Sequence, residues 1–187
     1  MCKPVVSIEF GNGKVVKIEL EPAEAPNSVN AFIDLVEKGI FDDREIKRIV
    51  PDFVIQPTYT SFDRDEVANI AVAGEFRANG FSNSLKLEKK VVGLGGDGKT
   101  MAGVSCFFFI MSDQAGEKLD GNFTGIGTVI EGWEEIERIE RVDTKKIDIG
   151  EENVVVNEPI VPQVMKKVTV ELNGHEVKDI EIIGLSD

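Results

Sequence analysis

The sequence predicts a mainly β protein, a closed antiparallel barrel whose ends are capped by two helices. Residues 5–10 and 14–20 are two β-rich runs joined by Gly11-Asn12-Gly13, which is typical of a hairpin turn. Further short apolar runs follow along the chain, the last of them over residues 162–172. Many short strands with few helices fit a sheet that closes on itself and is covered at its ends.

In two segments the apolar residues are spaced as in an α-helix and not as in a strand. The first is expected to begin at Asn27 or Ser28, either of which can cap a helix, and to end at Gly39, which suits the residue after the last turn. Its apolar positions follow the i, i+3, i+4, i+7 spacing and are Val29, Phe32, Ile33 and Val36. The second covers residues 133–142 and is expected to bury Trp133, Ile136 and Ile139. We expect the apolar face of each helix to pack into the hydrophobic core.

Composition limits the class of protein. The 187 residues are expected to form one domain over residues 1–187, and 42% of them are hydrophobic. A net charge of −13 makes nucleic acid a poor partner, because phosphates repel an acidic surface. No apolar run approaches the roughly 20 residues that span a bilayer, and no apolar signal core follows Met1. A cytoplasmic location without membrane contact is therefore expected.

The cysteines and the histidine predict no metal site and no cofactor. Cys2 and Cys106 have neither zinc spacing nor a disulfide framework, and Cys106 lies in an aromatic run where a small core residue is expected. His175, the single histidine, follows Asn173-Gly174 and is expected in a solvated turn.

The most informative stretch is residues 46–56, two short apolar strands that meet at Pro51-Asp52. Period-two alternation places Arg48 on the same face as Ile46 and Val50. A guanidinium among apolar neighbours is costly unless something pairs with it. Two interpretations remain open here: an arginine paired with a carboxylate, or a pocket in which a fixed cation faces a mostly apolar substrate.

This stretch resembles the active-site strands of the cyclophilins, the cyclosporin-binding peptidyl-prolyl isomerases. Their pattern is Phe-His-Arg-Val-Ile-Pro-Gly-Phe-Met-x-Gln-Gly-Gly, and the residues that match it are Arg48, Pro51, Phe53 and Gln56, with Pro57-Thr58 in place of the Gly-Gly. Other segments resemble the family too, namely residues 25–32, 74–81, 119–121, 127–132 and 162–172. The resemblance covers about residues 5–172, implies eight strands, and leaves an acidic, loop-like insertion at 143–159 and an extension at 173–187 that could form another hairpin arm.

The resemblance implies a peptidyl-prolyl cis-trans isomerase that acts, as a monomer without cofactor or metal, on proline-containing peptides and unfolded protein clients. It makes Arg48 and Gln56 the catalytic pair. The substrate-binding residues that it implies are Phe53, Val54, Phe107, Phe109, Leu119 and Phe123. Three positions depart from the family: Phe107 replaces a glutamine, Lys118 a tryptophan and Phe123 a histidine or tyrosine. These departures favour an alternative, a non-catalytic module that binds proline-containing segments.

A second motif indicates a different function. Residues 93–100 satisfy the G-x-x-x-x-G-K-[ST] pattern of a phosphate-binding loop, with Lys99 and Thr100 in the functional positions. That loop requires a helix beginning at the lysine. Here Met101 is followed by residues suited to a strand, so a glycine-rich loop without phosphate is the preferred interpretation, and nucleotide binding stays a third hypothesis.

Overall fold

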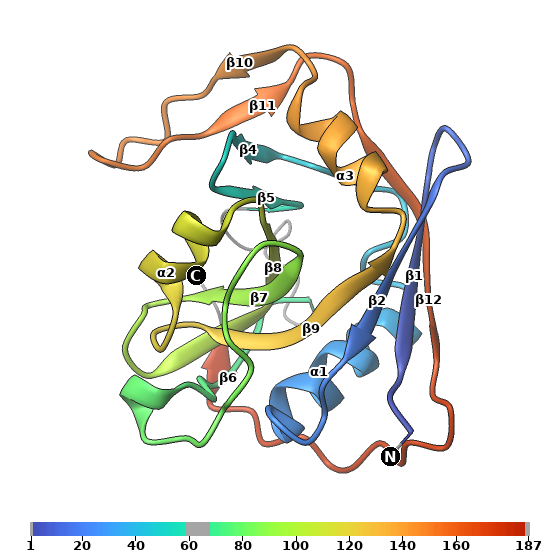
Figure 1. Ribbon diagram of the computed structural model, residues 1–187, viewed down its shortest axis with the longest axis vertical. Coiled ribbons are helices and arrows are strands. Elements are labelled where there is room, and N and C mark those ends of the chain that lie inside the picture. Colours follow the sequence, from blue (N-terminus) through green and yellow to red (C-terminus); the bar gives the residue numbers. More distant parts are fainter. Residues whose placement is uncertain (1, 59–67, 186–187) are drawn as a thin grey trace.

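The computed structural model describes residues 2–58 and 68–185, which form one large curled antiparallel sheet, a separate two-stranded sheet and three α-helices (Figure 1). The strands are β1 (Val5–Phe10), β2 (Val15–Leu20), β3 (Arg44–Glu45), β4 (Arg48–Val50), β5 (Val54–Gln56), β6 (Ile70–Ala73), β7 (Val91–Gly96), β8 (Met101–Ile110), β9 (Thr124–Glu131), β10 (Thr144–Lys146), β11 (Asn157–Pro159), β12 (Val164–Glu171) and β13 (Gly184–Leu185). The helices are α1 (Pro26–Glu37), α2 (Asp113–Leu119) and α3 (Trp133–Glu140), with a 3-10 turn at Arg77–Asn79. The mainly β prediction is confirmed.

Strand order explains how segments far apart in sequence meet. The path is β13-β6-β8-β7-β9-β2-β1-β12-β3, and β5 joins it by pairing with both β8 and β4. The predicted first hairpin is present, and Gly13 takes the left-handed conformation (φ +83°) that its turn needs. This order establishes a curled sheet, while closure into a barrel is a finer claim that it does not confirm.

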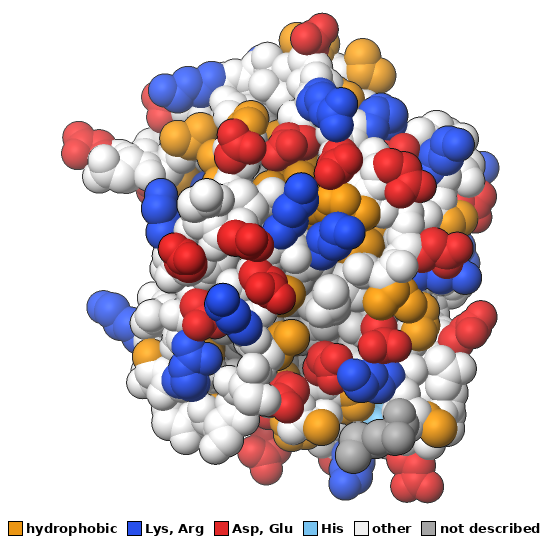
Figure 2. All heavy atoms as spheres, in the orientation of Figure 1, with side chains coloured by type: hydrophobic (Ala, Val, Ile, Leu, Met, Phe, Trp, Pro, Cys, Tyr) orange, Lys and Arg blue, Asp and Glu red, His pale blue; other side chains and the backbone are white. Residues whose placement is uncertain are grey.

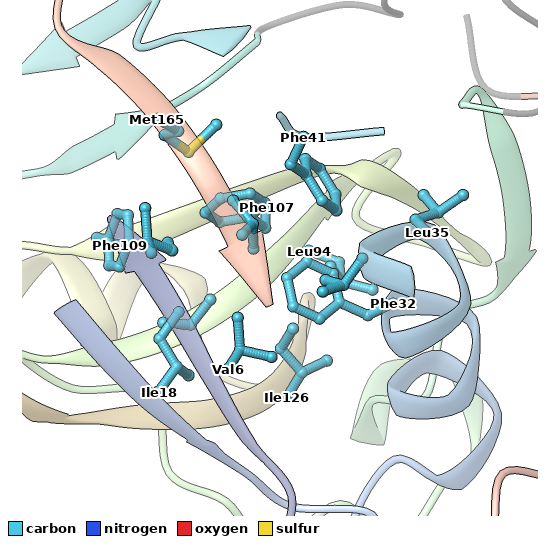
Figure 3. Packing of buried hydrophobic residues seen from close by; sticks show 14 of the residues in the cluster. Val6, Ile18, Phe32, Leu35, Phe41, Leu94, Phe107, Phe109, Ile126 and Met165 are labelled. Carbon is cyan, nitrogen blue, oxygen red and sulfur yellow. The ribbon is translucent and has the colours of Figure 1, made fainter. Parts of the chain in front are cut away.

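The core lies inside the curl, between the sheet and α1. Four phenylalanines meet there, and Phe107 packs edge-on against Phe32, Phe41 and Phe109 with ring centroids 5.3–5.7 Å apart (Figure 3). Such edge-to-face pairs suit the quadrupole of aromatic rings. The predicted stripe of α1 is buried throughout, which accounts for its helical spacing.

The start of α1 differs from the prediction. The helix begins at Pro26, and neither Asn27 nor Ser28 caps it. The cap comes from a distant residue, since the buried carboxylate of Glu75 accepts the N–H groups of Asn27 (3.2 Å) and Ser28 (2.7 Å). A carboxylate is stabilised by the positive end of the helix dipole, so Glu75 ties its loop to α1. Gly39 does end the helix, at φ +71°.

The number of helices was predicted wrongly, because α2 was missed. The Ser112 hydroxyl accepts the N–H of Ala115, Asp113 lies in the first turn and Lys118 in the last, all of which favour a helix. With seven residues, α2 is too short to show a full apolar stripe. No helix in the described ranges is long and apolar enough to cross a membrane.

The insertion and the tail also differ from the predictions. The insertion is not only loop: β10 and β11 pair within it, and Asn157 Nδ2 donates to the carbonyl of Ile49 on β4 (2.9 Å). The tail forms no hairpin of its own, because β13 pairs with β6. His175 is half-buried and hydrogen-bonds Asn30 on α1 (2.8 Å).

Acidic and basic side chains are interspersed over the face shown in Figure 2, with hydrophobic side chains between them. The net charge of −13 is therefore not gathered into one large acidic area on this face. This distribution suits solubility more than attraction of one highly charged partner.

Candidate active site

The site is built on the short β4–β5 hairpin that the sequence singled out. Arg48 and Gln56 are directly opposite each other in this pair, as are Val50 and Val54. Asp52 turns the chain with a positive φ of 61°, a conformation that aspartate adopts more readily than most residues. The hairpin therefore brings an arginine and a glutamine together by strand register alone.

Two hydrogen bonds fix the guanidinium of Arg48. Its Nη1 donates to Gln56 Oε1 (2.6 Å), and its Nε donates to the backbone carbonyl of Val155 in the insertion (2.7 Å). Both acceptors are neutral, and among the described residues no carboxylate contributes to the pKa of Arg48. Burial lowers that pKa below its ordinary value, yet an arginine stays charged at neutral pH. Within residues 2–58 and 68–185, the arginine is thus held in place by neutral acceptors with N–H groups of Nη2 left over, and no carboxylate pairs with it.

A cleft of about 530 Å³ opens beside this arginine. It contains six of the eight predicted site residues, which are Arg48, Phe53, Val54, Gln56, Leu119 and Phe123. Val54 and Leu119 are buried beneath it, and Phe53 and Phe123 are half-buried at its edges. The protein's own aromatic rings form its walls and do not fill it, so Arg48 faces a mostly apolar hollow whose lining also includes Asp97.

Phe107 and Phe109 are not in the cleft, and their predicted position is wrong. Both are fully buried in the core on the other side of β8. The residue that faces the cleft is Phe108, whose ring meets that of Phe123 at 84° with centroids 6.0 Å apart. Three consecutive phenylalanines allow the family's Phe-Phe to be matched in two registers. A shift of one residue moves every side chain of a strand to its opposite face.

The corrected register changes a second position. If the family's Phe-Phe corresponds to Phe107-Phe108, its preceding glutamine corresponds to Cys106, which lines the cleft. Cys106 is buried, as its aromatic neighbours in sequence predicted (8% exposed), and it also lines the cleft. Gly93 supports the register from the neighbouring strand, because a Cβ there would lie 2.7 Å from the Phe108 ring.

Further residues line the cleft that the sequence did not assign to it. Asp97 comes from the β7–β8 connection, Met101 from the start of β8, Val154 from the insertion and Leu185 from the tail. Asp97 lies in the phosphate-loop motif, which predicts a different function, and the other three have no neighbours in sequence that mark them as functional. Among the described residues, no group of three histidine, cysteine or acidic side chains is placed to hold a metal ion.

Comparison with known proteins agrees with this geometry. Residues 5–170 match the family model described as cyclophilin type peptidyl-prolyl cis-trans isomerase/CLD. The chain belongs to this family. It is 26% identical to peptidyl-prolyl cis-trans isomerase A of Dickeya dadantii over 81% of this chain and 78% of that one. It is 31% identical to peptidyl-prolyl cis-trans isomerase CYP57 of Arabidopsis thaliana over 88% of this chain, which corresponds to 34% of that longer protein.

The cyclophilin fold is also found among solved structures. A cyclophilin-type isomerase of Cryptosporidium parvum superposes with a TM-score of 0.68 at 20% identity, covering 90% of this chain and 98% of its own. A structure of the same protein obtained in the presence of the dipeptide Ala-Pro gives a TM-score of 0.67 at 19% identity. At these identities the likeness concerns the fold alone.

In this cyclophilin the phosphate-loop motif forms the end of β7 and the short connection to β8. A strand and not a helix follows Lys99. The carboxylate of Asp97 accepts the N–H groups of Lys99 (2.8 Å), Thr100 (2.8 Å) and Met101 (3.0 Å), and these bonds, with the backbone of Met101 first, lower the pKa of Asp97. The N–H groups that a phosphate would need are therefore already bound to a carboxylate.

The position of the family's tryptophan borders a separate hollow. Lys118 is exposed on α2 and lies outside the cleft, in a shallow depression that it shares with Phe53 and Asp52. A lysine ammonium is strongly hydrated and does not close an apolar wall as an indole does. The cyclophilin cleft is therefore more open on the α2 side of Phe53.

Proposed function

We propose that this protein accelerates the cis-trans isomerisation of X–Pro bonds in peptides and unfolded chains, with Arg48 as the catalytic residue. The observation that carries the proposal is the fixed, unneutralised guanidinium of Arg48 at the wall of an apolar cleft. The cleft needs no nucleophile, general base or metal for this reaction, because no covalent bond is broken.

The physical argument starts from the barrier. Rotation about a peptide bond costs about 18–20 kcal/mol, because amide resonance is lost in the twisted state. In that state the prolyl nitrogen regains a lone pair that can accept a hydrogen bond. A donor held at that nitrogen stabilises the transition state and not the planar ground state, which is the condition for catalysis. Each stabilisation of about 1.4 kcal/mol is worth tenfold in rate.

The residues around Arg48 fit this task. Its Nε and Nη1 are bound to Val155 and Gln56, so the guanidinium is oriented before a substrate arrives and little reorganisation is required. Phe53 and Leu119 offer an apolar surface of the kind that a prolyl ring prefers. Gln56 is proposed as the residue that orients Arg48. The structure of a related fold in the presence of Ala-Pro supports a proline-containing substrate.

We further propose that the sheet closes into the family's eight-stranded barrel. What supports this is the bend between β3 and β4, two consecutive short strands. Ile46 N–H donates to Gln163 O beside β12 (2.9 Å), and Lys47 N–H donates to Gln56 O on β5 (3.1 Å). Taken as one bent strand, β3 and β4 would link β12 to β5, and β5 pairs with β8. The prolyl site would then lie on the outside of a closed ring.

The experiment measures the rate of cis-trans exchange at the X–Pro bond of a tetrapeptide in the presence of the wild type, Arg48→Ala or Arg141→Ala. Arg141 is a matched control, because its side chain is 73% exposed at the C-terminal end of α3 and does not line the cleft. We expect the wild type and Arg141→Ala to accelerate exchange alike, and Arg48→Ala to lose at least about tenfold in kcat/KM with its fold intact. Equal activity of Arg48→Ala and the wild type would refute the role of Arg48.

A second candidate is a module that binds proline segments without turnover. The corrected register favours this candidate at one position, because Cys106 lacks the amide of the family's glutamine. Phe123 favours it as well, because a phenylalanine lacks the polar edge of the family's histidine or tyrosine. An isomerase and a binding module would both bind a proline peptide, so a binding measurement does not distinguish the two candidates. Faster cis-trans exchange of the peptide at a small molar fraction of protein does distinguish them, since a binding module changes the populations of the cis and trans forms and not the rate of their exchange.

A further inference from the structure

The C-terminal tail, residues 173–185, lies beyond the part of the chain that matches the family and yet reaches the cleft. It runs past α1 and adds β13 to the edge of β6 (Figure 1). The hydrogen bonds that hold it include Asn27 Nδ2 to Glu181 O (3.0 Å), Glu181 N–H to Asn27 Oδ1 (2.8 Å), His175 Nε2 with Asn30 Oδ1 (2.8 Å), Ile183 N–H to Ala71 O (2.9 Å) and Asn173 Nδ2 to Lys3 O (3.0 Å). The path of the tail is therefore specified by side chains of α1.

This path ends with Leu185 at the cleft. Leu185 pairs with Ile70 on β6, and its side chain lines the same cleft as Arg48 and Phe53. Even so, 56% of Leu185 is exposed. An apolar side chain that is held at a binding cleft and still open to solvent gains burial when a ligand covers it.

The distance between Leu185 and the prolyl site can be estimated from β8. Ala71, the neighbour of Ile70, pairs with Gly103, whereas the cleft aromatic Phe108 is five residues further along β8. Five residues of strand cover about 15 Å, and the irregular pairing between β7 and β8 shortens this. An extended peptide with its proline against Phe108 would bring a side chain about two to four residues away to Leu185.

We propose that Leu185 is a specificity-determining residue, which selects clients that carry an apolar side chain about two to four residues from the proline. The inference deepens the proposed function and rests on it. The occupant is the client itself, because the surface of Leu185 is continuous with the cleft that receives the proline. Partial burial of a leucine against Leu185 is expected to improve kcat/KM by about three- to tenfold over serine.

The test uses proline peptides in a serine-glycine background in which one leucine is moved from one to four positions away from the proline, on either side. The wild type is expected to prefer leucine over serine at one or more of these positions. In Leu185→Ser the ratio of kcat/KM for the leucine peptide to kcat/KM for the serine peptide should fall to near one. Ile182→Ser is the control, because Ile182 is similarly exposed (54%) in the same tail and does not line the cleft.

A second variant moves the tail without altering the cleft. Asn27→Ala removes both bonds to Glu181, so it should weaken the leucine preference in the same direction as Leu185→Ser. An unchanged preference in Leu185→Ser, or a change as large in Ile182→Ser, would overturn the proposal. A uniform rise in the activity of these variants on every peptide would also overturn the proposal, because it would show that the tail obstructs the cleft and does not select substrates. If no peptide were turned over, the proposed function would fail by itself, and the ratio of peptide affinities would still test Leu185.

Discussion

The Nη1 of Arg48 donates to Oε1 of Gln56 across a single pair of strands, at 2.6 Å. The bond makes the glutamine an orienting residue, because its amide carries no charge that would neutralise the cation. Arg48 keeps its positive charge for the substrate while one of its rotamers is preferred. Several consequences of this arrangement can be measured.

Replacement of Gln56 by alanine should lower kcat more than it raises KM. The guanidinium loses one of its two restraints, and a hydrogen bond to a charged group is worth about 1.5–3 kcal/mol, so a loss of about tenfold in kcat is expected. The measurement is steady-state kinetics on one peptide, with Gln114→Ala as the control, since Gln114 is exposed on α2. A rise in KM with unchanged kcat would show that Gln56 binds substrate and does not orient Arg48.

Neighbouring phenylalanines on β8 should respond to substitution in opposite ways. Phe107→Ala empties a site between three rings of the core and should cost about 3–5 kcal/mol of unfolding free energy. Phe108→Ala should raise KM for proline peptides at least about fivefold, because the ring forms a wall of the cleft. Denaturant unfolding and peptide kinetics on both variants separate the two roles. A larger KM effect in Phe107→Ala would contradict the observed register.

Glu75 should prove important for stability although it lies in a loop. Its carboxylate caps α1, so Glu75→Ala leaves two N–H groups unsatisfied, at a cost of about 1–3 kcal/mol. The measurement is the midpoint of denaturant unfolding. The control is Glu37→Ala, because Glu37 is an exposed glutamate in the last turn of the same helix. Equal losses in both variants would mean that the cap contributes nothing.

Acid should loosen the β7–β8 turn through Asp97. Three backbone N–H groups lower the pKa of Asp97 below its ordinary value of 3.8, so the folded state favours the ionised form. Stability from such a group is complete above the ordinary value and is lost as the pH falls below it. Between pH 5 and 2, the wild type should therefore lose more stability than Asp97→Asn. Parallel pH profiles would exclude this contribution.

Much of the fold followed from local patterns. The first hairpin, the stripe of α1 and the strands around Arg48 were all predicted, because each is encoded by neighbouring residues. The cap of α1 was not, since Glu75 is far from Asn27 in sequence and reaches it only through the fold. The helix α2 was missed for a different reason, because its seven residues are too few to show a full apolar stripe.

The site residues likewise divide into those that local sequence located and those that only the fold brings together. Arg48, Phe53 and Gln56 are fixed by spacing within one hairpin, and the sequence located them. The aromatic wall was placed one residue off, because Phe107 and Phe108 are chemically identical and only the pairing with β7 assigns their faces. Leu185 could not be predicted at all, since its place depends on how the tail crosses α1.

The central claim, that a fixed arginine turns over proline bonds, is tested most directly by NMR exchange spectroscopy on an X–Pro peptide in large molar excess over the protein. The account predicts exchange cross-peaks between the cis and trans forms with the wild type and their near-complete loss with Arg48→Ala. Shifted peptide signals without exchange in the wild type would show binding alone and would contradict the claim.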